Sequence, residues 1–421
     1  MDFIPLYFLF AFLLLSLWVY LKKGTGKLFV FVIAIYLVSS FFSIVYANTD
    51  FFIFAWKQQY ELTFIPFVYW LLCFFILAVP IVKYDKLRVS KVNIPMKAVY
   101  IICYSSLLLS IIPFIELFPL LKGVFSNSDL ASTFSDIHDD NEKTLPLSFV
   151  GRQCYRVLRY MYLPTLLCMI PVLTGKKKIF PLLGIGLSIA VVIIAALLLS
   201  TRGIIFATII YVSLMIVLYY PLLKKDYISR IIRYLVLVMS VVFFAFLTIT
   251  IYRNINHQDS MTDYSLVVFL ARYAGEGFIN FNQYFGHIID YTNGDYCFYV
   301  FKKLMGMDMP TVDRDYIMYV VSNHVGIPMM VFYTFIGFFV IDIGYLGTII
   351  FFIIVSLFVR NEMKIISGTI YFHQLYLIFI YVAIIADGTC VYRYSWNTSA
   401  QLLVMILLYF LLKFVERSKK A

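Results

Sequence analysis

Long runs of hydrophobic residues alternate with short polar segments along most of this 421-residue chain. A helix needs about 20 apolar residues to cross a hydrocarbon core of about 30 Å. Runs that reach or approach this length cover residues 3–21, 28–46, 62–82, 98–119, 152–173, 180–199, 203–222, 234–252, 343–359, 365–386 and 398–415. The pattern predicts an all-α polytopic membrane protein with about eleven transmembrane helices.

Composition supports this class, since 62 % of the residues are hydrophobic and only 14 % are charged. A soluble domain of that composition would have too little polar surface to face water. The net charge of +11 could indicate a nucleic-acid partner, but the basic residues cluster between apolar runs, which is typical of membrane orientation instead. The six cysteines have no metal-ligand spacing, so they indicate no particular chemistry.

The charges between the apolar runs predict the orientation of the chain. One set of loops holds 21 of the 34 basic residues and only 4 of the 23 acidic ones. These loops are 22–27, 83–97, 176–178, 224–233, 360–364 and the tail 413–420. Because cytoplasmic loops carry the excess of lysine and arginine, we expect this set to be cytoplasmic. The N-terminus and residues 253–324 are then extracytoplasmic, and the C-terminus is cytoplasmic.

The long polar stretch divides the chain into helices in 1–252, a large extracytoplasmic region in 253–342, and the last helices in 343–421. Residues 253–324 hold three of the five histidines, among many charged and aromatic residues. Such a mixture suits a sugar or phosphate ligand, although a solvated loop with aromatic rings at the bilayer interface is the alternative. The apolar residues 327–341 are too few for a separate crossing, so a re-entrant or interfacial segment is expected. Asp342 is placed to cap the following helix.

Arginines on the predicted outer side depart from the orientation rule. Arg152, Arg156 and Arg159 are spaced by four and three residues, so they share one helical face. Arg202 lies in a Ser-Thr-Arg-Gly turn that interrupts a long apolar run. Guanidinium groups bind phosphate oxygens in pairs, which predicts an anion site, whereas headgroup contact is the alternative for each of them.

The order of several short motifs resembles the Wzy-type polysaccharide polymerases, the repeat-unit polymerases of bacterial O-antigen and capsule assembly. The resemblance covers roughly residues 150–360. It rests on the Thr-Arg-Gly hairpin at 201–203, Arg-Tyr-Ala-Gly-Glu-Gly at 272–277, Ile-Gly at 336–337 and Asp-Ile-Gly-Tyr-Leu-Gly at 342–347.

The resemblance implies a GT-C-like enzyme of the bacterial inner membrane. Such enzymes transfer a growing glycan from undecaprenyl diphosphate to the non-reducing end of another lipid-linked repeat unit at the periplasmic face, without a metal. The implied partners are the undecaprenyl diphosphate-linked oligosaccharide and membrane lipids, with a chain-length regulator and a flippase as further candidates. An O-antigen ligase of the same architecture and a lipid-linked oligosaccharide flippase are the alternative functions.

Candidate residues for this chemistry follow from position and residue type. The candidate catalytic residues are His324, Glu276, Arg272 and Arg202. The candidate substrate-binding residues are Arg152, Arg156, Arg159, Arg253, Tyr273, Arg314 and Asp342. Arginines would neutralise the diphosphate, and a base would accept the proton of the attacking hydroxyl. His324 is the first choice for that base, Glu276 the second, and the pair Asp313 and Asp315 the third.

Overall fold

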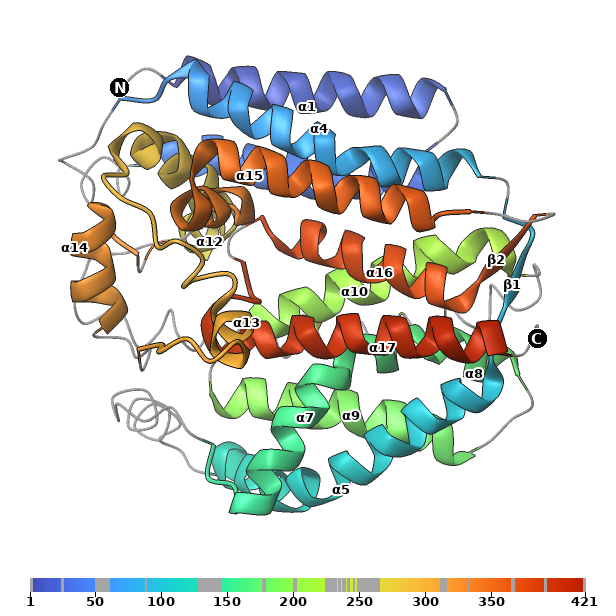
Figure 1. Ribbon diagram of the computed structural model, residues 1–421. Coiled ribbons are helices and arrows are strands. Elements are labelled where there is room, and N and C mark those ends of the chain that lie inside the picture. Colours follow the sequence, from blue (N-terminus) through green and yellow to red (C-terminus); the bar gives the residue numbers. More distant parts are fainter. Residues whose placement is uncertain are drawn as a thin grey trace. The chain divides into compact units, whose positions relative to one another are not determined.

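The structure is a computed structural model of the full chain, and it is almost entirely helical (Figure 1). It describes residues 3–23, 26–49, 61–87, 89–126, 145–175, 179–199, 203–223, scattered positions between 233 and 247, 266–310, 316–329, 331, 333–364, 368–389 and 392–418. Within these residues, eight helices are long and apolar enough to cross a membrane. The expected class, an all-α polytopic membrane protein, is confirmed at this level.

The eight long helices agree closely with the predicted apolar runs. They are α1 (Ile4–Lys22), α2 (Lys27–Ala47), α4 (Phe64–Lys86), α5 (Met96–Ser126), α9 (Ile179–Leu198), α10 (Gly203–Tyr219, extended by the 3-10 turn Tyr220–Leu222), α15 (Phe335–Glu362) and α17 (Ser399–Ser418). Most of them leave large apolar side chains exposed, as lipid-facing helices do.

Three predicted runs differ from this pattern. The run 152–173 forms α7 (Phe149–Leu167) and the short α8 (Met169–Thr174). The run 365–386 forms the short strand β2 (Thr369–Tyr371) and α16 (Phe372–Asp387), which has only 16 residues. The run 234–252 lies largely outside the described residues.

The contacts divide the chain into two compact units. The first unit contains Met1–Arg88, Tyr264–Gly368 and Tyr381–Leu403, and the second contains Val89–Asp263, Thr369–Ile380 and Val404–Ala421. Neither unit is a continuous segment, because helices that are distant in sequence bury their apolar faces together.

In the first unit, α4 lies beside α15, while α2 lies between α1 and α12 (Leu266–Tyr284). Its core is aromatic. The Trp70 ring stacks on Phe74 with centroids 5.0 Å apart, and the Phe278 ring meets Trp70 edge-on, also at 5.0 Å. Such pairs contribute beyond the area that they bury. The shorter elements of this unit are the 3-10 turns Phe285–His287 and Trp396–Thr398, α13 (Tyr299–Leu304), the π-helical turn Tyr316–Val321 and α14 (Ser322–Val325).

In the second unit, α5 packs against α7 and α9 around a cluster of buried leucine, isoleucine and valine side chains. Gly184 permits close contact, since a Cβ atom there would lie 2.2 Å from the carbonyl oxygen of Cys103. Strand β1 (Lys91–Asn93) pairs in parallel with β2. Nearby, the Glu416 carboxylate accepts from the backbone N–H of Phe372 at 3.0 Å and contacts the His373 ring.

The structure corrects one expectation about the segment before the ninth predicted helix, which is the role of Asp342 as a helix cap. Residues 335–341 are helical and buried, and they form the first turns of α15. Thr334 caps that helix by accepting from the N–H of Gly337, so Asp342 is not the cap. The backbone breaks at Gly344, whose φ of +75° is accessible chiefly to glycine. The helix predicted from residue 343 therefore begins at this break, and a short helical segment from Phe335 precedes it within α15.

Candidate functional site

Helix α12 carries the first group of candidate residues, and a glycine determines how it sits. A Cβ atom on Gly275 would lie 2.3 Å from the backbone nitrogen of Ser43 on α2. Ser39 and Ser43 donate hydrogen bonds to the carbonyls of Ala274 and Gly275 at 2.6 and 2.7 Å. Small residues and hydroxyl bonds of this kind hold helices together in membranes. The segment predicted as part of a polar loop is therefore a helix inserted against α2.

The far end of α12 is fixed to the start of α4. The side-chain amide of Asn282 accepts from the N–H of Thr63 at 2.9 Å and donates to its carbonyl at 2.7 Å. Asn282 is almost completely buried, so both polar groups of the amide need these partners. The two anchors give α12 one orientation, and that orientation decides where its charged residues point.

Polar residues form a stripe along one face of α12. Arg272, Glu276 and Asn280 follow at intervals of four residues, so they lie one above another. The Nε atom of Arg272 lies 3.2 Å from the Glu276 carboxylate, whose side chain is only 3 % exposed, whereas that of Arg272 is 43 % exposed. Burial raises the pKa of Glu276, while the Arg272 charge and a hydrogen bond from Asn280 oppose the shift. Glu276 thereby orients a guanidinium group that reaches the surface. Tyr273, the next residue on the helix, is half-buried.

A second arginine–carboxylate pair lies in the segment after α16. The Nε atom of Arg393 is 2.5 Å from the Asp387 carboxylate, which is 2 % exposed. Gly388 in the same segment accepts a hydrogen bond from the N–H of Phe335, at the start of α15. Neither residue of this pair is among the candidates predicted from the sequence. A signal was present, since Arg393 is a basic residue between two helices on the predicted outer side, the same departure that distinguished Arg202.

His324, the predicted base, lies on the short helix α14 and has a carboxylate neighbour. Its Nε2 atom is 3.5 Å from the Asp290 carboxylate and 3.2 Å from the carbonyl oxygen of Tyr291. Half of the His324 side chain is exposed. Gly326, with a φ of +80°, ends α14 and allows Ile289 to pack closely. A histidine oriented by a carboxylate and open to solvent can accept a proton.

Asp342 binds the loop 292–297, which follows Asp290 and Tyr291 in the chain. It is completely buried, and its carboxylate accepts from the Thr292 hydroxyl and from the N–H groups of Gly294, Tyr296 and Cys297 at 2.9 to 3.1 Å. A buried carboxylate with several donors is stable without a cation. Both oxygens of Asp342 are thus used to shape the 292–297 turn.

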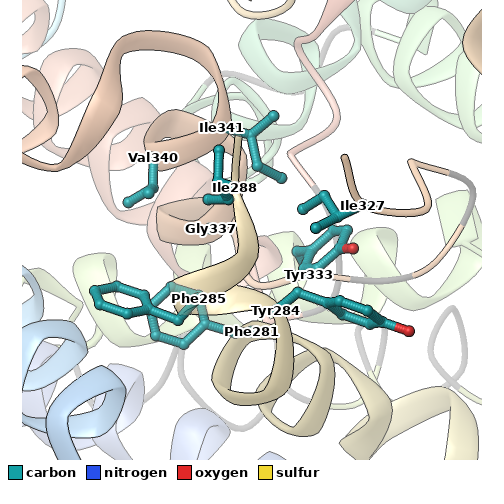
Figure 2. A pocket seen from close by; sticks show the side chains of 9 residues that line it. All are labelled: Phe281, Tyr284, Phe285, Ile288, Ile327, Tyr333, Gly337, Val340 and Ile341. Atoms are coloured by element: carbon teal, nitrogen blue, oxygen red, sulfur yellow. The ribbon is translucent and has the colours of Figure 1, made fainter. Parts of the chain in front are cut away.

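An aromatic seam lies between the end of α12 and the segment that carries Ile327 and Tyr333. Phe281 and Tyr284 at the end of α12 and Phe285 in the turn that follows line this seam together with Tyr333 and Ile327 (Figure 2). The Tyr333 hydroxyl donates to the carbonyl of Pro328 at 2.8 Å, and burial, followed by the neighbouring Tyr284 and Glu276, raises the pKa of Tyr333. The cavity in the seam has a volume of about 10 Å³, room for one water molecule and far too little for a sugar.

The other predicted residues fall elsewhere. Arg152, Arg156 and Arg159 lie on α7 in the second unit, where all three are exposed, as one helical face requires. Arg202, Arg253, Arg314, Asp313 and Asp315 lie outside the described residues. Of the predicted set, the structure brings Arg272 and Glu276 into contact and adds partners for His324 and Asp342.

Among the described residues, no three histidine, cysteine, aspartate or glutamate side chains converge as a metal site. No protein-family model, curated protein or solved structure matches this chain.

Proposed function

We propose that this protein is a membrane-embedded glycosyltransferase that polymerises lipid-linked repeat units, in the manner of the Wzy-type enzymes that its motifs resemble. The observation that supports this proposal most strongly comes from the end of the first unit that contains α12 and α14 (Figure 1). There, a half-exposed His324–Asp290 pair accompanies an arginine that a buried carboxylate orients. The proposal includes a GT-C-like architecture with eleven crossings, in which α7 with α8, α16 and residues 234–252 supplement the eight long helices.

The proposed reaction depends mainly on neutralising the negative charge that develops on the leaving diphosphate. The oxygen of an acceptor hydroxyl forms a bond to the anomeric carbon of the donor glycan. The bond between that carbon and the diphosphate oxygen breaks, and its electron pair leaves with undecaprenyl diphosphate. An oriented guanidinium group lowers the energy of the developing negative charge. Arg272 is suited to this role, because Glu276 holds its Nε atom while much of the side chain stays exposed.

The proton of the acceptor hydroxyl passes to His324 in this scheme. His324 has half of its surface exposed and Asp290 beside it, so it can meet a substrate. Glu276 is buried and paired with Arg272, so its contribution is the orientation of that arginine. Exposed aromatic rings on the same side would stack on sugar faces.

The proposed function is tested by deletion of the gene followed by electrophoresis of the surface polysaccharide. A polymerase predicts loss of the long-chain ladder, with a single repeat unit still attached. Loss of all attached repeats would refute the proposal and would support the flippase or the ligase. An unchanged ladder would refute all three functions.

The role of His324 is tested by the purified His324→Gln variant, since glutamine keeps hydrogen bonding but cannot take the proton. Removal of a general base costs about 10² to 10⁴ in rate. We expect turnover at least about a hundredfold slower, with unchanged binding of lipid-linked repeat units. His287→Gln is the matched control, because His287 is an exposed histidine on the same side. Near-normal turnover by His324→Gln would remove His324 from the mechanism.

A further inference from the structure

A cavity of about 440 Å³ opens among α1, α2, α4 and α15 of the first unit. Its walls are apolar and include Phe29, Phe75 and Val79, and its rim carries Lys83, Lys86 and Arg360. The last residues of α4 and α15 lie at the opposite end of this unit from α12 and α14 (Figure 1). The cavity is therefore separate from the candidate site and does not depend on the proposed function.

The lining residues of α4 form a stripe with a polarity gradient. Phe75, Val79, Lys83 and Lys86 follow at intervals of three or four residues, so they share one helical face. The stripe is apolar toward the middle of the helix and cationic at its C-terminal end. Eleven residues of helix span about 16 Å, close to the thickness of one leaflet of hydrocarbon. The cations thus lie where phosphate groups of a lipid leaflet would lie.

The three cations at the rim lack an acidic counterpart within the described residues. None of the ion pairs found in that part of the chain includes them. The nearest acid along α4, Asp85, accepts instead from the N–H groups of Leu28 and Phe29 at 3.1 and 2.9 Å. Lys83 donates one hydrogen bond to the carbonyl of Arg360 at 2.7 Å, and an ammonium group has two further donors. Clustered positive charges of this kind favour a bound anion.

We propose that this cavity binds an anionic glycerophospholipid of the leaflet that the basic loops face. Its phosphate meets Lys86, Arg360 and the remaining donors of Lys83, and an acyl chain lies along Phe29, Phe75 and Val79. The volume falls within the usual range for ligand pockets. Basic pockets between helices on the cytoplasmic side are typical sites for anionic head groups. The apolar wall distinguishes this site from one for free phosphate.

The test measures binding of three probes to the purified full-length protein in detergent: phosphatidylglycerol, phosphatidylcholine and inorganic phosphate. Native mass spectrometry counts retained lipid, and thermal unfolding reports stabilisation. We expect phosphatidylglycerol to bind and stabilise, and the other two probes to do neither. Equal binding of phosphatidylcholine, or stabilisation by phosphate alone, would overturn the proposal.

Variants then locate the site. Each cation close to an anionic lipid changes affinity about fivefold, so Lys86→Gln with Arg360→Gln should weaken phosphatidylglycerol binding about 25-fold. Lys83 stays in place because it binds the end of α15. Val79→Trp fills the apolar wall without a change in charge and should also displace the lipid. Lys22→Gln is the matched control, since Lys22 ends α1 and lies over the Trp18 ring, outside the cavity. Binding by the double variant equal to that of the control refutes the site.

Discussion

Substitution of Gly275 by alanine tests whether α12 is a packed helix of the first unit. A methyl group at this position would lie 2.3 Å from the backbone nitrogen of Ser43 and 2.5 Å from the carbonyl carbon of Phe42. Both are backbone atoms of α2, which cannot turn aside as a flexible side chain can. The two helices must therefore separate by roughly 1 Å to reach ordinary van der Waals contact.

The expected cost follows from the contacts that this separation would weaken. Overpacking of a well-filled interface costs about 1 to 3 kcal/mol. The hydrogen bonds from Ser39 and Ser43 to α12 would lengthen, and each contributes about 0.5 to 1.5 kcal/mol. Alanine's better helix propensity returns about 1 kcal/mol. We expect a net loss of about 2 kcal/mol, or about 4 to 8 °C in the midpoint of thermal unfolding.

The assay is thermal unfolding of the purified protein in detergent, followed by the loss of the monodisperse peak in size-exclusion chromatography. Gly186→Ala is the matched control, because a Cβ atom at Gly186 in α9 meets nothing within 4 Å. That variant should be as stable as the wild type or slightly more stable. If Gly275→Ala unfolds at the same temperature as Gly186→Ala, α12 does not pack on α2 as described.

Three further predictions concern the polar end of the first unit. Asn293 is exposed, so a cysteine placed there should react with an impermeant thiol reagent in intact spheroplasts; labelling only after lysis would place this loop inside the cell. Because burial raises the pKa of Glu276, its contribution to stability is fully present below the ordinary glutamate pKa and is lost as the pH rises through the raised value. The wild type should therefore lose thermal stability as the pH rises above the ordinary glutamate pKa of about 4, Glu276→Gln should lose less, and parallel curves would contradict the assignment. Arg393→Ala leaves the buried Asp387 carboxylate without its partner and should cost about 3 kcal/mol or more, which Asp387→Asn in the same chain should partly restore. No loss in Arg393→Ala would show that the pair does not form.

The membrane helices were predictable from sequence because each one satisfies its own backbone hydrogen bonds. An apolar run of sufficient length needs no partner to be stable in hydrocarbon, so its position follows from composition alone. This is why the predicted runs at 3–21, 28–46 and 62–82 agree with α1, α2 and α4 to within a few residues. His324 stays a prediction from residue type and position, and its contact with Asp290 was not predicted.

Helix α12 shows what sequence could not decide. Its charged and amide residues interrupt the apolar pattern, so the segment reads as part of a polar loop. It is helical and buried because Gly275 fits against the backbone of α2 and Asn282 pairs with Thr63, more than two hundred residues away in sequence. Only the fold brings such partners together.

The kink at Gly344 and the Arg393–Asp387 pair also involve contacts with segments that the local sequence does not reveal. Gly344 breaks the helix with a φ of +75°, and the Tyr291 ring lies so close to it that a Cβ atom there would be 3.1 Å from the ring. Arg393 and Asp387 are close in sequence, yet their contact depends on a turn that also binds the start of α15. The sequence by itself therefore determined the membrane class and most of the helices, which depend on local hydrophobicity. The tertiary structure decided which charges are buried and which partners hold them, since desolvation and hydrogen bonding at each group depend on segments distant in the chain.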